Sequence, residues 1–245
     1  MGQIEVNALS VKMAGSFEAE VTFPGIHLDP EREYPVLWVI HEDGSSPADL
    51  LRYLLLFEEF AKTNNCYVIC PSVQHSLCTD MVWGTLNEQF VATECPGIFR
   101  HMYHLSDRPE DNTILGIGTG AYGALKMAVR HPETYGKGIA VDGSLDLAAR
   151  CDLIGKEVTS GFTRQTDASL AAIFGDPSKV RGSEHDLYAL DYEGKVITLF
   201  AGSDSAVSAE NAELAAKHPE ISTRIEDYGK DGFERERMLK AALGI

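Results

Sequence analysis

The clearest chemical pattern in the sequence is a glycine-dense turn near the middle of the chain. Gly116-Ile117-Gly118-Thr119-Gly120 ends a short apolar run and precedes a helical pattern that begins at Ala121. A strand, a sharp turn and a helix in this order form a nucleophile elbow, in which the pattern G-x-S-x-G exposes a serine hydroxyl. Here the middle position is Gly118, which has no side chain and cannot attack a substrate.

The same turn satisfies a second chemical pattern. Residues 118–123, GTGAYG, match G-x-G-x-x-G, and Asp142 ends a later apolar run about 20 residues on. Such glycines let a backbone approach a pyrophosphate, while the acidic residue binds a ribose. Two strand–helix units precede this turn, whereas the dinucleotide fingerprint normally opens its domain. Dinucleotide binding by this turn therefore stays open as an alternative.

The elements that position the turn follow from apolar periodicity. Residues 4–12 and 16–24 alternate with a period of two around Ala14-Gly15, which predicts an antiparallel hairpin. From Tyr34 onward, runs that are apolar throughout alternate with helical stretches, as in parallel strands covered on both faces. These runs are residues 35–40, 66–70, 113–117, 137–141, 195–202 and 222–228. We therefore expect an α/β fold with a mostly parallel central sheet, an N-terminal antiparallel hairpin and helices on both faces.

Helix signals and breakers suggest how the rest of the chain is organised. Ser46-Pro47 precedes a helical stretch over residues 48–62, where the serine can cap and the proline presets the backbone. Residues from about 146 to 191 contain Gly, Pro and charged residues that interrupt any periodicity, so we expect a cap-like excursion there. The length suits one domain over residues 1–245.

Three segments give the chain a resemblance to a known family. The elbow continues as AYGALKMAVRHPETYG, VDGSLD occupies residues 141–146, and SLCTDM occupies residues 76–81. From about Tyr34 to its end, the chain resembles the esterase D, tributyrin esterase and S-formylglutathione hydrolase branch of the α/β hydrolases. The resemblance implies an α/β-hydrolase fold and a serine-esterase site with a Ser-Asp-His triad.

The residues of such a site transfer poorly to this chain. By the resemblance, the nucleophile position is Gly118, the acid is Asp204 in AGSDS, and the histidine position in residues 229–233 holds Asp231. The oxyanion loop, which in the family is of an H-G-G type, here reads His41-Glu42-Asp43-Gly44, and the backbone amide of Thr119 is its partner. Carboxylates beside a developing oxyanion would raise the reaction barrier.

The histidines give a check that needs no alignment. The order in this fold is nucleophile, acid, histidine, and no histidine follows His218, which itself ends a predicted helix. Losing serine or histidine from a working triad costs roughly 10⁶ in turnover, about 8 kcal/mol of transition-state stabilisation. The sequence therefore predicts a catalytically impaired pseudo-esterase that acts as a ligand-binding or interaction protein.

Two other hypotheses remain at this point. A carboxylesterase or other acyl hydrolase could use a displaced nucleophile, such as Thr119 beside the lost serine. Carboxylates that follow strand ends could also converge and hold a hard cation, because open α/β sheets bind ligands at that edge. These metal candidates are Glu42, Asp43, Asp204 and Asp231.

Composition limits the partners. A formal net charge of -16 disfavours nucleic acid and anionic membranes, because both are bound through Lys and Arg. The five cysteines, at positions 66, 70, 78, 95 and 151, have no paired spacing, which indicates free thiols in a reducing, cytoplasmic setting. We expect no cofactor and a small-molecule ligand in the vestigial pocket. The resemblance also implies that the protein can form homo-oligomers.

Overall fold

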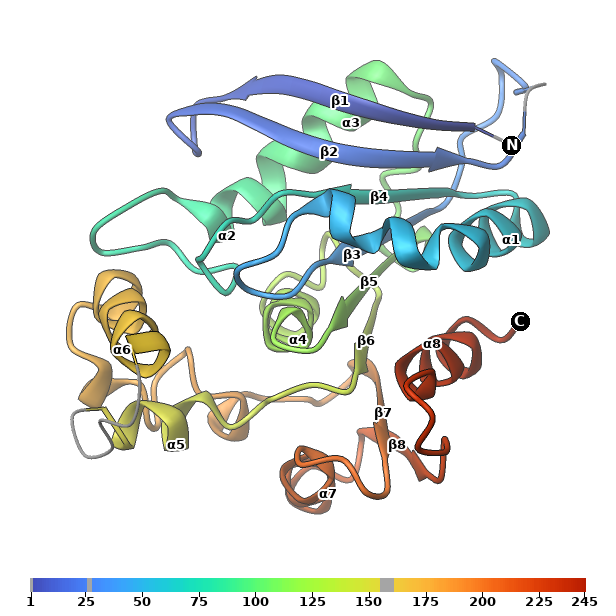
Figure 1. Ribbon diagram of the computed structural model, residues 1–245. Coiled ribbons are helices and arrows are strands. Elements are labelled where there is room, and N and C mark those ends of the chain that lie inside the picture. The colour runs from blue at the N-terminus through green and yellow to red at the C-terminus, as the bar shows by residue number, and fades with distance from the viewer. Residues whose placement is uncertain (1, 26–27, 155–160) are drawn as a thin grey trace.

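The computed structural model describes residues 2–25, 28–154 and 161–245, which form an eight-stranded sheet with helices on both faces (Figure 1). The strand order is β1-β2-β4-β3-β5-β6-β7-β8. The strands are β1 (Gly2–Ser10), β2 (Gly15–Phe23), β3 (Val36–Ile40), β4 (Tyr67–Pro71), β5 (Asn112–Ile117), β6 (Lys137–Val141), β7 (Val196–Gly202) and β8 (Ser222–Glu226). β1, β2 and β4 pair antiparallel, and all pairings from β4 to β8 are parallel. The predicted sheet and hairpin are therefore confirmed.

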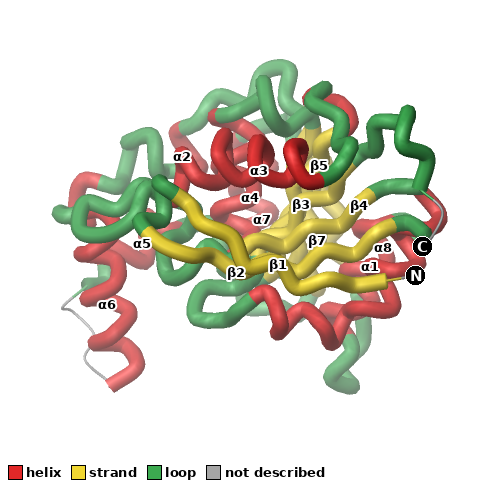
Figure 2. Tube along the Cα trace, turned by 90° about the horizontal axis from the view of Figure 1, so that it is seen from above, coloured by secondary structure: helices red, strands yellow, loops and turns green. Residues whose placement is uncertain are grey.

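Helices cover the sheet because successive strand residues point to opposite faces. On one face, Leu37 and Val39 of β3 pack against the 3₁₀ helix η1 (Pro47–Tyr53), α1 (Leu54–Asn64) and α8 (Glu234–Leu243). On the other face, Val36 and Trp38 of β3 join the side of α3 (Cys95–Met102), α4 (Gly120–Arg130) and α7 (Ser208–Lys217). Figure 2 shows α1 and α3 on opposite sides of the strands.

Local sequence explains where the first of these helices begins. Ser46 is the N-cap of η1, and its backbone N–H donates to Asp49 Oδ2 at 2.7 Å, the reciprocal arrangement of a capping box. The predicted helix over residues 48–62 is thus present, but its first turns are 3₁₀. Asn65 ends α1 in the left-handed region, at a φ of 49°.

The excursion between β6 and β7 is more helical than its sequence indicates. It contains α5 (Leu147–Asp152), α6 (Gly161–Phe174) and the short 3₁₀ helices η4 (Pro177–Lys179) and η5 (Leu187–Ala189), while residues 155–160 of the expected cap lie outside the described residues. The C-terminal end of α6 is attached to a loop of the main body, because Val82 and Trp83 donate backbone hydrogen bonds to Ile173 and Ala172.

The described helices include none that is long and apolar enough to cross a membrane. The five cysteines are buried and free. Burial raises the pKa of the Cys66 thiol to about 12 and that of Cys78 to about 12, so both thiols stay protonated at neutral pH.

Candidate functional site

The backbone of a nucleophile elbow is intact at the end of β5. Gly118 has a φ of +56°, and its N–H donates to the carbonyl of Val141 at 2.9 Å, which ties the turn to the end of β6. A glycine adopts this left-handed conformation without the steric cost that a Cβ imposes. The turn therefore has the shape that presents a nucleophile, with no side chain on it.

The space above Gly118 is filled by the side chain of Glu42. A Cβ added at Gly118 would lie 2.8 Å from Glu42 Cδ and closer still to Glu42 Oε1. Carbon atoms in non-bonded contact stand about 3.5–4.0 Å apart, so the two groups cannot coexist without movement. Glu42, which the sequence places in the oxyanion loop, thus occupies the place where a serine side chain would begin.

Arginine side chains hold Glu42 in this position. Arg235, the second residue of α8, donates from Nη1 to Glu42 Oε2 at 3.0 Å, and Arg52 Nη2 lies 3.6 Å from the same oxygen. Arg235 also donates from Nη2 to Asp142 Oδ2 at 3.1 Å, and Ser205 Oγ donates to Asp142 Oδ1 at 2.6 Å. Burial lowers the pKa of Arg235, but the charges of Glu42 and Asp142 raise it overall, so it stays a cation.

Sequence reasoning missed Arg235 and Arg52 altogether. Arg235 is 193 residues from Glu42 along the chain, and no spacing rule connects two such distant positions. The only available signal was chemical, because an uncompensated carboxylate in a closed site requires a cation nearby. Asp142 was noted only as the acidic residue of a dinucleotide fingerprint.

A backbone amide of the loop that the resemblance assigns to the oxyanion is engaged by the elbow. The backbone N–H of Asp43 donates to Thr119 Oγ1 at 2.6 Å, so a side chain of the elbow already satisfies this donor. An oxyanion hole works through N–H groups that point at the position where negative charge develops. The loop therefore lacks one free donor where the resemblance places the oxyanion.

The residues that the resemblance assigns to the acid and histidine positions contact different cations. Asp204, which follows β7, lies with Oδ2 2.8 Å from Lys230 Nζ. Asp231 instead pairs with Arg237 of α8, and both Asp204 and Asp231 are largely exposed. The residue that follows β8 and contacts Asp204 is therefore Lys230.

A pocket of about 500 Å³ opens beside these loops at the carboxyl ends of β6, β7 and β8. It is separate from the space above Gly118, and Asp142 connects the two because it lines the pocket and contacts Arg235. The lining residues are Asp142, Gly202, Ser203, Asp204, Ser205, Asp227, Tyr228, Gly229, Lys230, Glu234 and Met238.

The expected convergence of acidic residues is not found. Glu42 pairs with Arg235, Asp204 with Lys230 and Asp231 with Arg237, while Asp43 lies 3.5 Å from His75. Within the described residues, no three His, Cys, Asp or Glu side chains are grouped as a metal could require. Each of the four carboxylates has a different basic neighbour, so these contacts lend no support to a cation site formed by the four residues, which stays a prediction.

Dinucleotide binding by residues 118–123 does not fit the packing of the turn. A Cβ at Gly120 would lie 2.5 Å from the carbonyl oxygen of Ile40, and one at Gly123 would lie 2.7 Å from Cys78 Sγ. These glycines allow α4 to approach β3 and a neighbouring loop, and Glu42 covers the first glycine. The glycines of this turn are therefore accounted for by the close approach of α4 to its neighbours, without a bound pyrophosphate.

Comparisons with known proteins agree with this architecture. A family model described as "Putative esterase" matches residues 10–237. The chain belongs to this family. A comparison with curated protein sequences finds no match.

Solved structures of the same fold cover nearly the whole chain. The substrate-bound fluorophosphonate-binding serine hydrolase FphF of Staphylococcus aureus is 21% identical, with a TM-score of 0.82 over 99% of this chain and 97% of that chain. The S-formylglutathione hydrolase FrmB of the same organism is 20% identical, with a TM-score of 0.80 over 99% and 97%. Identities this low show the fold alone, and they confirm the α/β-hydrolase architecture.

Two histidines of this esterase-family chain lie near the elbow. His41 is buried and neutral, because burial lowers its pKa; its Nδ1 lies 2.8 Å from the carbonyl oxygen of Glu42, and its Nε2 accepts from the N–H of Val73 at 3.1 Å. His75 is exposed, and its Nδ1 lies 3.5 Å from Asp43 Oδ1. No sequence pattern indicated this imidazole–carboxylate pair. His218 caps the C-terminal end of α7 as expected, near Tyr188 and away from the elbow.

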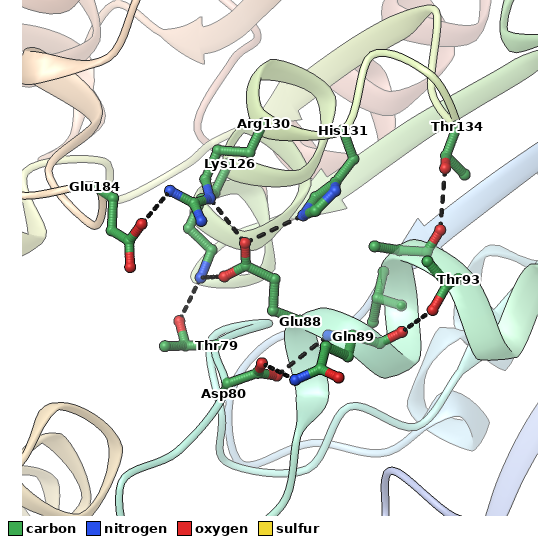
Figure 3. Close-up of polar contacts among 12 residues, drawn as sticks. Thr79, Asp80, Glu88, Gln89, Thr93, Lys126, Arg130, His131, Thr134 and Glu184 are labelled. Carbon is green, nitrogen blue, oxygen red and sulfur yellow. Dashed lines mark hydrogen bonds and ion pairs between the residues drawn. The ribbon is translucent and has the colours of Figure 1, made fainter.

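A buried charge network holds α2 (Asn87–Gln89) and the loop before it against α4 (Figure 3). Glu88 accepts from Arg130 Nε at 2.7 Å, and it lies 3.1 Å from Lys126 Nζ and 3.1 Å from His131 Nε2. Lys126, which is fully buried, also donates to Thr79 Oγ1. Burial would raise the pKa of Glu88, but His131, Lys126 and Arg130 together lower it well below its usual range. Glu88 is therefore ionised at neutral pH.

This network predicts a pH dependence of stability. The hydrogen bond with Glu88 and the proximity of Glu133 raise the pKa of His131 above its usual value. A raised pKa stabilises the fold below about 6.5, and this contribution is lost as pH rises through the folded pKa. The difference in free energy of unfolding between the wild type and His131→Asn is therefore expected to shrink from pH 5.5 to pH 8.5 in urea titrations. The exposed His104→Asn should show no such trend, and a pH-independent His131→Asn difference would contradict the assignment.

Proposed function

We propose that this member of the esterase family has lost serine-esterase chemistry and acts as a ligand-binding or interaction protein. One observation carries the proposal: the carboxylate of Glu42, paired with Arg235, stands where the nucleophile would project from Gly118. A missing side chain alone could reflect one substitution. A charged side chain held in the vacated space means that the surroundings have been rebuilt.

The rest of the site supports the same proposal. The donor that an oxyanion would need is engaged by Thr119, and Asp204 contacts Lys230 in place of a histidine. Triad members act as a unit, so the loss of nucleophile and base together leaves roughly the background rate. Substitutions at catalytic positions can leave the fold and its binding surfaces unchanged, because the residues that set the fold differ from those that carry the chemistry.

The test is hydrolysis of p-nitrophenyl acetate and butyrate, together with labelling by a fluorophosphonate probe. We expect turnover no faster than that of buffer containing bovine serum albumin. Mass spectrometry of the intact protein should show no added mass from the probe. Stoichiometric covalent labelling at any residue would refute the proposal.

A second candidate function, an acyl hydrolase with a displaced nucleophile, is favoured by one observation. Thr119 and His75 both contact Asp43, whose N–H binds Thr119 Oγ1 and whose Oδ1 lies 3.5 Å from His75 Nδ1. An imidazole oriented by a carboxylate is the usual activator of a hydroxyl nucleophile. If turnover is found, Thr119→Val and His75→Ala should each abolish it under this alternative, whereas Thr113→Val, on β5, should not.

A further inference from the structure

We propose that Arg52 and Arg235 form a carboxylate-binding site at the elbow, and that Glu42 occupies this site as an internal ligand. The inference deepens the proposed function, on which it rests, by naming a ligand class for the former catalytic position. The ligand is a small monocarboxylate, such as acetate or butyrate, whose carboxylate would take the place of the Glu42 side chain.

The guanidinium of Arg235 has a second partner that keeps it in place when the Glu42 side chain leaves. Arg235 directs one arm of its guanidinium to Glu42 and the other to Asp142, which keeps it oriented. Asp142 is itself fixed, because it accepts from Ser205 Oγ and donates its N–H to the carbonyl of Phe200 at 2.8 Å. A guanidinium fork held in this way is preorganised to receive a carboxylate.

The backbone of Glu42 is held independently of its side chain. Its backbone carbonyl accepts from the N–H of Ser45 at 3.1 Å and from Ser45 Oγ at 2.8 Å, so the loop stays in place. Its side chain is 28% exposed, and those of Arg235 and Arg52 are 32% and 53% exposed. Solvent therefore reaches all three groups, and Gly118 adds no side chain that would block the vacated space.

Charge favours a monoanion. With Glu42 withdrawn, Arg235 still pairs with Asp142, whereas Arg52 loses the carboxylate of its described ion pair, so the two arginines are left with one positive charge in excess. A dianion would overcompensate this charge within a chain whose formal net charge is already -16. Since Glu42 is tethered, it competes at a high effective concentration, and the wild type should bind external carboxylates weakly.

The test is calorimetric titration of Glu42→Ala with sodium butyrate, against sodium chloride at matched ionic strength. We expect the Kd of the variant for butyrate to be at least about 10-fold lower than that of the wild type. In the wild type, Glu42 occupies the arginine site most of the time, and the apparent affinity falls with the fraction of molecules whose site is open. Butyrate should also raise the Tm of Glu42→Ala and leave that of the wild type and of Glu59→Ala, an exposed control on α1, unchanged.

A double variant identifies the binding group. Glu42→Ala with Arg235→Met should return butyrate affinity to the wild-type level. If Glu42→Ala does not fold, Glu42→Gln keeps the side-chain volume while weakening both ion pairs, and it should bind butyrate more tightly than the wild type. Equal affinity of the wild type and the Glu42 variants, or tight binding that survives Arg235→Met, would overturn the inference. Ester hydrolysis by the wild type would instead contradict the proposed function without contradicting the carboxylate-binding site.

Discussion

Combining Glu42→Gly, Gly118→Ser and Lys230→His is expected to give esterase turnover about 100-fold above that of Gly118→Ser alone, a partial return of the roughly 10⁶ that a triad supplies. Gly118→Ser by itself should stay at background. Its Cβ would meet Glu42, and no imidazole would accept the proton of the new hydroxyl. Removing Glu42 clears the space, and histidine at position 230 would stand where Lys230 now contacts Asp204.

We expect only a partial return because a donor in the loop that the resemblance assigns to the oxyanion stays engaged. The N–H of Asp43 would still bind Thr119 Oγ1, and losing one such donor costs roughly 10²–10³ in turnover. Initial rates with p-nitrophenyl butyrate and active-site titration with a fluorophosphonate provide the measurement. Adding Thr119→Val, which frees the Asp43 N–H, should raise the rate of the triple variant further.

The matched control moves the histidine by one residue. Asp231→His in the same Glu42→Gly, Gly118→Ser background should remain near background, because Asp231 points to Arg237 and not to Asp204. The sequence resemblance favoured Asp231 as the histidine position, so the two triple variants compare that alignment with the observed contacts. Equal or greater activity of the Asp231→His variant would show that the loop after β8 rearranges and that the contact of Lys230 is not the relevant one.

The difference between these two positions illustrates what the sequence could and could not predict. Apolar periodicity located all eight strands, because burial of a sheet is encoded locally by alternating or continuous apolar residues. The elbow and the glycine at its centre, Gly118, could likewise be recognised from a few consecutive residues. Which residue of a glycine-rich loop turns toward Asp204 depends on backbone angles, and both Gly229 and Gly232 adopt positive φ there. A shift of one residue in such a loop reverses the direction of a side chain.

The ion pairs of the site lie beyond local sequence for a different reason. Glu42 comes from the loop after β3, Asp142 from the end of β6 and Arg235 from α8, and only the parallel sheet brings these three together. Their types were visible, but charge alone suggested convergence of Glu42, Asp43, Asp204 and Asp231 on a cation. In the structure each of these carboxylates instead has a basic neighbour of its own. Such pairing is expected because unpaired ions in a partly buried site are costly.

Glu88→Gln is expected to lower the free energy of unfolding by about 3–5 kcal/mol at pH 7, the usual cost of removing one partner of a buried ion pair. The substitution keeps the side-chain shape but leaves the ammonium of Lys126 fully buried without an anionic partner among the contacts described, which are then Thr79 Oγ1 and the ring of Tyr122, 5.8 Å away. Burial already lowers the pKa of Lys126, and the charge of Glu88 opposes that shift. Urea unfolding followed by circular dichroism measures the effect.

The double variant Glu88→Gln with Lys126→Met separates charge from packing. If the loss arises from an uncompensated ammonium, removing that ammonium should recover more than half of the stability, because similarly shaped neutral groups replace a buried ion pair at little cost. A loss below about 1 kcal/mol in Glu88→Gln alone would mean that Lys126 is neutral in the folded chain. Additive losses in the double variant would mean that Glu88 acts mainly through Arg130 and His131, the network's other two basic residues.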